Sequence, residues 1–307
     1  MRSILLRDYG GETAAQVADS PKPTAGPGQV LVRVRAAGIN ALDWKVREGY
    51  VRDAFPLQLP TVLGIELAGV VEAVGPGTSR LRVGDRVMGP LGGLGAYAEF
   101  VAVDEAKLAR TPERLGDVAA AALPVATLAA WQSLHFAGAV GAGTRVLVHG
   151  AAGALGGFAV QFAREAGAFV VGTAAARDLD VVRGLGAHQV VDYRAQRFED
   201  VVSDIDLVLA YVGGEVVDRS WKVLKPTGAM VGTASPEILA RTPAGRQGHW
   251  FVMKPDAALL EKLASDVATG ALKSRVGEVV GFDDIPAAIE RSRVGTQHGK
   301  AVADFAR

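Results

Sequence analysis

The 307-residue chain contains no cysteine. This absence excludes disulfides, thiolate nucleophiles and every zinc site that needs a cysteine ligand. An excess of either charge is also absent, because 33 Lys and Arg residues balance 33 Asp and Glu residues. The balance gives no bulk attraction to nucleic acid or to an anionic membrane, so neither is expected as a partner. A cytoplasmic protein fits this composition best.

Long uninterrupted apolar runs are missing as well. The N-terminal segment reaches Arg7 and Asp8 before the apolar core of a signal peptide is complete. The longest apolar run, from Val118 to Trp131, contains Pro124 and is too short to span a bilayer. We therefore expect neither export nor membrane insertion. What the chain does have is 49% apolar residues over a length that favours two domains, each with its own core.

The N-terminal part is rich in short strands. Val30, Val32 and Val34 alternate with Arg33 and Arg35, which is the period of a strand with one buried face. Similar strands, separated by Gly and Pro turns, continue to about residue 120. This pattern predicts a compact β-rich unit.

From Gly116 the pattern changes to Ala-rich helix, and strands then alternate with helices. The strands are apolar on both faces, as in RVLVHG and IDLVLAYV. Such alternation predicts an α/β fold with a doubly wound parallel sheet. The tail from Arg275 returns to strand, helix and strand, and its pattern alone does not assign it to a domain.

A glycine-rich turn, RVLVHGAAGALGG, links the first of these strands to a helix. Gly150, Gly153 and Gly156 have the spacing G-x-x-G-x-x-G, and the context would present backbone N–H groups and a helix N-terminus to a pyrophosphate. A purely structural corner is the alternative. His149, at the end of a buried strand, is interpreted as a satisfied structural residue rather than an acid or base. The predicted phosphate cradle comprises Gly150, Ala152, Gly153, Ala154, Leu155 and Gly156.

The end of the second strand bears on the choice of dinucleotide. An NAD-binding domain places an acid there, whereas this chain has Thr173 and, shortly after it, Arg177. A hydroxyl and a cation suit a 2′-phosphate, so NADP(H) is favoured. Arg177 as an ordinary solvated residue is the alternative, and Asp178 and Asp180 lie close to it. Tyr193, after the third strand, either lines the same pocket or is a strand-end aromatic.

Several segments together resemble one known family. In order, and across nearly the whole chain, they are similar to the zinc-independent, quinone oxidoreductase-like branch of the medium-chain dehydrogenase/reductase superfamily. The resemblance implies a GroES-like substrate domain, residues 1–122 and 272–307, enclosing a Rossmann NADP(H)-binding domain, residues 123–271. It also implies an active site in the cleft between the domains, and a homodimer. The segments are AGPGQVLVRVRAAGINALDWKVREG, GIELAGVVEAVGPG, GDRVMG, GAYAEFV, AALPVATLAAWQSL, VLVHGAAGALG, VLKPTGAMV and HGKAVADFA.

The same resemblance bears on metal and chemistry. Zinc-dependent relatives take their catalytic metal through a Cys and a His, and those positions are Asn40 and Ile65 here, beside a retained Glu66. Neither side chain replaces a thiolate or an imidazole at zinc. No metal is therefore expected, and hydride transfer from NADPH to a quinone or to the β-carbon of an enone is favoured over alcohol oxidation.

The resemblance places the candidate catalytic residues in the segment GINALDWKVREGY. Asn40 is a candidate to hold the nicotinamide ribose or a substrate oxygen, and Asp43 lies beside it. Lys45 or Tyr50 would stabilise a developing oxyanion. The alternatives are a helix cap for Asp43, a solvated side chain for Lys45 and lid packing for Tyr50.

Further cofactor contacts are expected later in the chain. In relatives, a Thr often contacts the carboxamide of the nicotinamide; the aligned position here is Ala129, and Thr127 lies nearby in the sequence. Tyr211 would either narrow the cofactor pocket or pack outside it. Two other functions stay open: an NADPH-binding sensor or structural or accessory protein without turnover, and a zinc-dependent alcohol dehydrogenase, which metal analysis would reveal. The expected contacts are Asn40, Thr127, Tyr211, Val212, Thr233, Phe251 and Val252, with Trp250 as an apolar wall.

Overall fold

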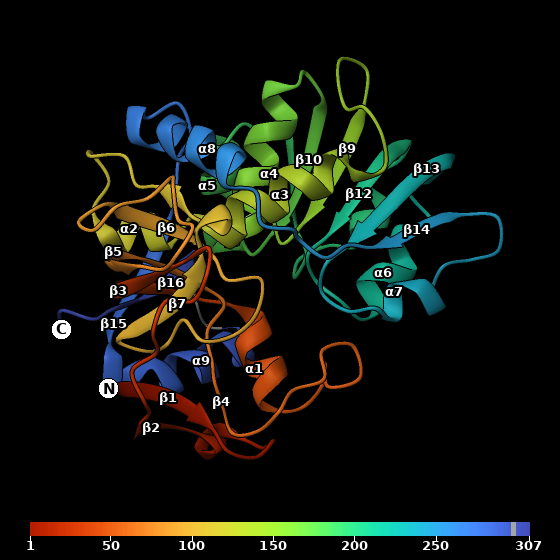
Figure 1. Ribbon diagram of the computed structural model, residues 1–307. Helices are drawn as coiled ribbons and strands as arrows, with labels where there is room; N and C mark the ends of the chain where they lie inside the picture. The colour runs from red at the N-terminus through yellow and green to blue at the C-terminus, as the bar shows by residue number, and fades with distance from the viewer. Residues whose placement is uncertain (296–298) are drawn as a thin grey trace. The chain divides into compact units, whose positions relative to one another are not determined.

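The computed structural model describes residues 1–295 and 299–307, so the segment HGKAVADFA is described from Gly299 onward and His298 lies outside the described residues. The chain divides into two compact units (Figure 1). The first comprises Met1–Val125 and Pro255–Arg307, and the second comprises Ala126–Lys254.

The first unit is built on a seven-stranded sheet in the order β15-β16-β3-β5-β6-β8, with β7 also pairing with β3. Along β3 the valines are buried and Arg33 and Arg35 are exposed, as the alternation of the sequence predicts. A second, three-stranded sheet has the order β2-β1-β4. The strands are β1 (Arg2–Leu6), β2 (Ala15–Asp19), β3 (Gln29–Ile39), β4 (Thr61–Val62), β5 (Glu66–Val74), β6 (Arg86–Pro90), β7 (Phe100–Asp104), β8 (Ala109–Arg110), β15 (Val276–Gly281) and β16 (Lys300–Asp304).

The α-helices among the described residues of this unit are α1 (Ala41–Arg47), α2 (Asp117–Ala121), α8 (Ala257–Thr269) and α9 (Ile285–Val294). Helix α1 packs against α9, and α8 packs against β8. The contacts of α8 place residues 255–271 with the β-rich unit, whereas the sequence-based boundary placed them in the Rossmann domain. The tail, which the pattern left unassigned, pairs through β16 with β3 in the first sheet.

The second unit is a six-stranded parallel sheet in the order β11-β10-β9-β12-β13-β14. The order reverses between β9 and β12, which is where doubly wound sheets bind ligands. The predicted GroES-like and Rossmann-type α/β architecture is confirmed. The elements are α3 (Pro124–Phe136), β9 (Arg145–His149), α4 (Ala154–Glu165), β10 (Phe169–Ala174), α5 (Leu179–Gly184), β11 (Gln189–Asp192), β12 (Ile205–Ala210), α6 (Glu215–Ser220), β13 (Leu224–Gly232), α7 (Glu237–Ala240) and β14 (Gln247–Trp250).

In the part of the chain that the structure describes, one segment, Asp117–Phe136, is long and apolar enough to meet the length and composition of a membrane span, with a mean hydropathy of 1.2. It contains α2 and α3, and 67% of its apolar window is buried inside the protein. Such burial is typical of a core helix, because a spanning helix must turn its apolar side chains to lipid.

Candidate cofactor and active site

The glycine turn between β9 and α4 is shaped by three glycines with different roles. Gly150 has a φ of 70°, a left-handed conformation that favours glycine. The N–H of Gly153 donates to the carbonyl of Gly150 at 2.9 Å, closing the turn. A Cβ on Gly156 would lie 2.1 Å from the Gly150 oxygen and 2.8 Å from Cα of Ala151. The helix therefore packs so closely on the turn that only glycine fits at position 156.

The same turn leaves hydrogen-bond donors available. None of the described side chains caps α4, whose N-cap residue is the exposed Gly153. The first N–H groups of a helix have no intrahelical partner, so those of Ala154, Leu155 and Gly156 are open to an external acceptor. Together with the positive end of the helix dipole, they suit the pyrophosphate of a dinucleotide. The predicted cradle residues, including the half-buried Ala152, thus lie together at one helix end.

The end of β10 corrects one part of the sequence prediction. Thr173 was expected to offer its hydroxyl to a 2′-phosphate, but its side chain is buried and its Oγ1 lies 3.1 Å from Nδ1 of His149. Arg177 is different, because 53% of its side chain is exposed and its Nε lies 3.6 Å from a carboxylate oxygen of Asp178. Tyr193 is similarly exposed just beyond the neighbouring strand β11. Arg177 and Tyr193 therefore remain the candidates at this edge of the sheet.

His149 is buried, and both of its ring nitrogens have a partner, as expected of a structural residue. Its Nε2 lies 2.9 Å from Oγ of Ser220, and that hydroxyl donates to the carbonyl of Val216 at 2.6 Å. The hydroxyl hydrogen is therefore used, so Nε2 carries the proton and Nδ1 accepts from Thr173. Burial, and secondarily the charge of Arg219, lowers the pKa of His149 to about 3. The ring stays neutral near pH 7 and holds β9 against β10 and α6.

The remaining predicted contacts in the second unit divide between its interior and its surface. The Tyr211 hydroxyl lies 2.8 Å from Oγ of the buried Ser133, so it packs inward, and burial raises its pKa. Thr127 and Phe251 are buried, Thr233 is half-buried, and Val212 and Val252 are exposed.

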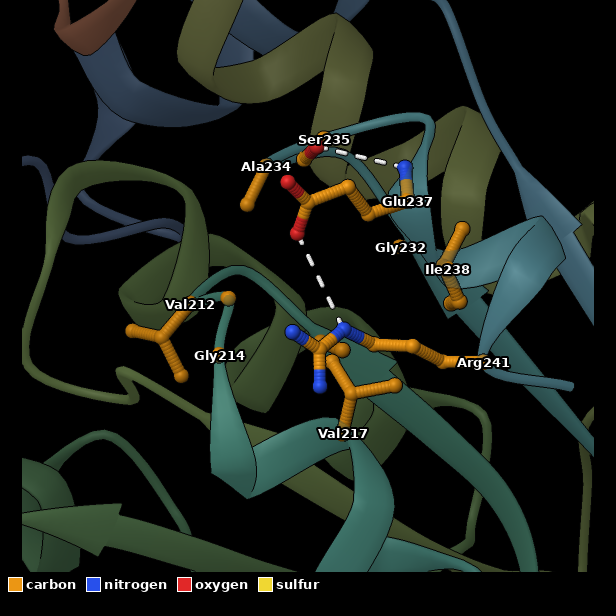
Figure 2. A pocket seen from close by; sticks show the side chains of 11 residues that line it. Val212, Gly214, Val217, Gly232, Ala234, Ser235, Glu237, Ile238 and Arg241 are labelled. Carbon is orange, nitrogen blue, oxygen red and sulfur yellow. Dashed lines mark hydrogen bonds and ion pairs between the residues drawn. The ribbon is translucent and has the colours of Figure 1, made fainter.

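A small hollow with a volume of about 10 Å³ lies at the carboxyl ends of β12 and β13 (Figure 2). Of the predicted cofactor residues, Val212 is among those that line it. Across the hollow, Nε of Arg241 approaches a carboxylate oxygen of Glu237 at 3.7 Å, and its Nη1 donates to Asp218 at 2.6 Å. Both carboxylates pair with the guanidinium of Arg241, so this hollow does not offer an unpaired cation to a ligand.

In the first unit, four polar side chains meet below the end of β3. Asn40 is 8% exposed, Glu66 and Asp43 are fully buried, and Lys300 is 4% exposed. The ammonium of Lys300 contacts Oε1 of Glu66 and donates to Oδ1 of Asn40 at 2.5 Å. The Asn40 amide nitrogen donates to Oε1 of Glu66 at 2.8 Å. A buried ion pair thus encloses the side chain predicted to contact the ligand.

Asp43 fills the structural role that was its alternative. Its Oδ2 accepts from the backbone N–H of Asn40 at 2.7 Å and from the hydroxyl of Tyr97 at 2.6 Å, which fixes the first turn of α1. Burial raises the pKa of Asp43 to about 7, opposed by its hydrogen bond from Tyr97. Asp43 is thus a fully buried helix cap, and its catalytic role stays a prediction.

Lys45 and Tyr50 differ in exposure. Lys45 is half-buried, its Nζ lies 5.5 Å from the centre of the Trp44 ring, and burial lowers its pKa. Tyr50 is 73% exposed and meets the edge of Trp44 with ring centres 5.8 Å apart. The lowered pKa makes the Lys45 ammonium a stronger proton donor than an ordinary lysine.

The sequence analysis missed Lys300 of this cluster and Tyr97, the partner of Asp43. Lys300 opens the strand KAVAD, whose next three residues are apolar and buried, and Tyr97 lies in the segment GAYAEFV. A lysine at the start of a buried strand is rare unless it is paired, and that signal points to Lys300.

The cluster does not fit a zinc ion. Asn40 stands where a thiolate would be needed, and both oxygens of Glu66 are occupied, Oε2 by the backbone N–H of Val125 at 2.7 Å. The ammonium of Lys300 beside Glu66 would repel a second cation. Within residues 1–295 and 299–307, no three His, Asp or Glu side chains form a group suited to a metal.

Comparisons with known proteins agree with this architecture. The Alcohol dehydrogenase GroES-like domain family matches residues 26–113, and the Zinc-binding dehydrogenase family matches residues 185–302. The chain is 36% identical over 202 residues to the chloroplast envelope quinone oxidoreductase homolog of Arabidopsis thaliana, covering 63% of this chain and 61% of that protein.

In two further comparisons, the match covers a larger share of the other protein. A 2-haloacrylate reductase of Burkholderia sp is 36% identical over 245 residues, which are 75% of this chain and 73% of the relative. The structure of the Escherichia coli quinone oxidoreductase complexed with NADPH superimposes with a TM-score of 0.88 at 25% identity. That superposition covers 99% of this chain and 100% of the other.

Proposed function

Because the chain belongs to the quinone oxidoreductase-like branch of the medium-chain dehydrogenase/reductase superfamily, an oxidoreductase family, we propose that it reduces quinones, enones or related small electrophiles with NADPH. The observation that carries the proposal is the turn around Gly156, where a Cβ would overlap the backbone and the helix N–H groups stay open. The turn does not need these free N–H groups for its own stability. The groups suit the pyrophosphate of a dinucleotide.

The residues present fit NADP(H). The N-terminus of α4 would hold the pyrophosphate, and Arg177 would pair with the 2′-phosphate. When bound, NADPH supplies the hydride, and the protein supplies orientation and electrostatics. The relatives support an electrophilic carbon acceptor, because one acts on a 2-haloacrylate and another is a quinone oxidoreductase. The ion pair between Lys300 and Glu66 supports chemistry without a metal.

The test of the function begins with binding. NADPH and NADH are titrated by fluorescence, and a panel of quinones and enones is then assayed for nucleotide oxidation. NADPH binding with turnover of at least one compound is the expected result. Failure to bind either nucleotide would refute the proposal, and tight NADPH binding without turnover would support the non-catalytic sensor instead.

The Arg177→Ala variant tests the nucleotide preference. Removing one charge-assisted contact to a phosphate is expected to weaken NADPH binding by about tenfold to a hundredfold and to leave NADH binding within about twofold. Arg183→Ala is the matched control, since Arg183 is an exposed arginine of the same region that pairs with Asp180 at 2.7 Å. Equal losses for NADPH and NADH would contradict the role given to Arg177.

The Lys45→Met variant tests the proton donor. General acid catalysis typically contributes about a hundredfold or more, so kcat is expected to fall by that order while the NADPH dissociation constant stays unchanged. In the wild type, kcat should decline as pH rises through a pKa below the ordinary 10.5 of lysine, because burial lowers that pKa. Tyr50→Phe is the control and should keep kcat. Loss of activity in Tyr50→Phe alone would reverse the assignment.

A further inference from the structure

A tyrosine hydroxyl inside the second unit has no part in the proposed reaction. Tyr211 is the first residue after β12, and its hydroxyl lies 2.8 Å from Oγ of Ser133 on α3. Ser133 is fully buried and has a single hydroxyl hydrogen, which it donates to the carbonyl of Ala130 at 3.2 Å. The Tyr211 hydroxyl is therefore the donor to Ser133. These two hydrogen bonds, here called the hydroxyl relay, tie the end of β12 to α3.

The Tyr211 hydroxyl keeps its proton. Burial raises the pKa of Tyr211, and the hydrogen bond with Ser133 opposes this rise only in part. Because its hydrogen is engaged by Ser133 and its pKa is raised, Tyr211 is a poor proton donor to a substrate. Its role must therefore come from where it holds the chain.

The segment after β12 lies directly against the glycine turn. In the parallel ladder of β12 and β9, Ala210 pairs with His149. The next residues, Tyr211 and Gly150, therefore follow at the same level beyond the two strands. An ideal Cβ on Gly150 would lie 4.0 Å from Cβ of Tyr211 and 3.4 Å from Cγ1 of Val212, which are ordinary contact distances. Val212, on the segment that leads to α6, thus forms one wall of the glycine turn (Figure 2).

The position of Gly150 matters for the N–H groups that follow it. Its carbonyl accepts the N–H of Gly153 at 2.9 Å, and Gly153 is the N-cap residue of α4. Gly150 has a φ of 70°, and a glycine has more backbone freedom than any other residue, so a packed neighbour is what restricts it. A turn already held in its bound conformation binds more tightly, because less freedom is lost on binding.

We propose that the hydroxyl relay positions the phosphate cradle by holding Val212 against Gly150. Tyr211 and Ser133 are then positioning residues of the nucleotide site, and all of these residues belong to the second unit. The inference rests on the proposed function, since it requires a nucleotide at this turn. It predicts an effect shared by NADPH and NADH, because both carry the same pyrophosphate.

The test measures the dissociation constants of NADPH and NADH for Tyr211→Phe, Ser133→Ala and the double variant. Each single change is expected to weaken both nucleotides by about fivefold, the value of one neutral hydrogen bond, with the KM for the electrophile within about twofold. The double variant should bind no more weakly than the weaker single variant, because both changes break the same link. Thr242→Val is the control: it removes another hydroxyl hydrogen bond of the second unit, to the carbonyl of Ile238 at 2.7 Å, and should bind both nucleotides as the wild type does.

The double variant also separates positioning from stability. Each single change leaves one member of a buried hydrogen bond without its partner, which lowers the melting temperature, whereas the double variant replaces both partners by apolar groups. The double variant should therefore regain most of the lost melting temperature and still show the fivefold loss of affinity. Affinity that recovers together with the melting temperature would overturn the inference.

Val212→Ala tests the path from the relay to the turn. It removes the methyl groups that contact Gly150, so it should weaken both nucleotides by a similar factor. Combined with Tyr211→Phe it should add no further loss, because the relay acts through Val212. Additive losses in this pair would overturn the inference.

The outcomes also separate the inference from the function on which it rests. A wild type that binds neither nucleotide overturns the proposed function. A wild type that binds NADPH and reduces the electrophile normally, while Tyr211→Phe and Ser133→Ala keep full affinity for both nucleotides or change only the KM for the electrophile, overturns the inference alone.

Discussion

Gly156→Ala is expected to weaken NADPH binding by at least about a hundredfold. The added Cβ would lie 2.1 Å from the carbonyl oxygen of Gly150 and 2.8 Å from both the Gly150 carbonyl carbon and Cα of Ala151. All three are backbone atoms, so no side-chain rotation relieves the overlap. The N-terminus of α4 must move away from the turn, and the N–H groups that form the phosphate cradle lose their common direction. Equilibrium titration of NADPH by fluorescence gives the measurement.

Gly157→Ala is the matched control for this change. It adds the same methyl group one residue further along the same helix, where the nearest atom is the flexible Cδ1 of Leu185 at 3.3 Å. Alanine also favours the helical conformation over glycine by about 1 kcal/mol. We expect Gly157→Ala to fold at least as well as the wild type and to bind NADPH with unchanged affinity. Wild-type affinity in Gly156→Ala would show that the turn is not the cradle.

The shape of the glycine turn was predictable from the sequence because its parts are local. The glycines, the strand before them and the helix after them lie within RVLVHGAAGALGG, and spacing along one turn determines their geometry. The role of Thr173 was not predictable in the same way. Its hydroxyl faces His149 on the neighbouring strand, and that direction depends on which face of the sheet position 173 occupies.

The cluster around Asn40 shows even more clearly that contacts between distant strands cannot be predicted from local sequence. Lys300 is 260 positions from Asn40 in the chain and meets it only through the pairing of β16 with β3. The sequence showed the retained Glu66 and the absent zinc ligands, but it did not show what replaces the metal as the partner of that carboxylate. For the same reason the placement of α8 depends on its contact with β8, which no local pattern contains.

The two units respond to acid in opposite directions through their buried titratable groups. Asp43 in the first unit has a pKa raised from 3.8 to about 7, so the folded state holds a proton that the unfolded chain releases. Its effect is that stability falls as pH rises between those values. His149 in the second unit has a pKa lowered from 6.5 to about 3, so the unfolded chain binds a proton that the folded state excludes. Its effect is that stability falls as pH drops through that window.

His149→Gln is therefore expected to remove the share of the second unit's loss of stability between pH 6.5 and pH 4.5 that His149 causes; His188 of the same unit, whose pKa burial also lowers, keeps its own share. A single group of this kind contributes a slope of up to about 1.4 kcal/mol per pH unit in the free energy of unfolding. Urea unfolding of the wild type and the variant across this range, followed by hydrogen exchange in β9 and α6, gives the slope. The carboxylate of Glu199, whose pKa its hydrogen bond with Arg219 lowers to about 2, is present in both proteins, so its own contribution to the slope cancels in the comparison.

His135→Gln provides the control, because it removes an exposed histidine of the same unit, whose Nδ1 lies 2.8 Å from the carbonyl of Trp131. Its slope should match that of the wild type. An unchanged slope in His149→Gln would mean that the folded state accepts a proton on His149 without cost. That result would contradict the neutral ring held between Thr173 and Ser220. Because His149 ends the strand that leads into the cradle, the same acid range should also weaken NADPH binding, and His149→Gln should preserve it.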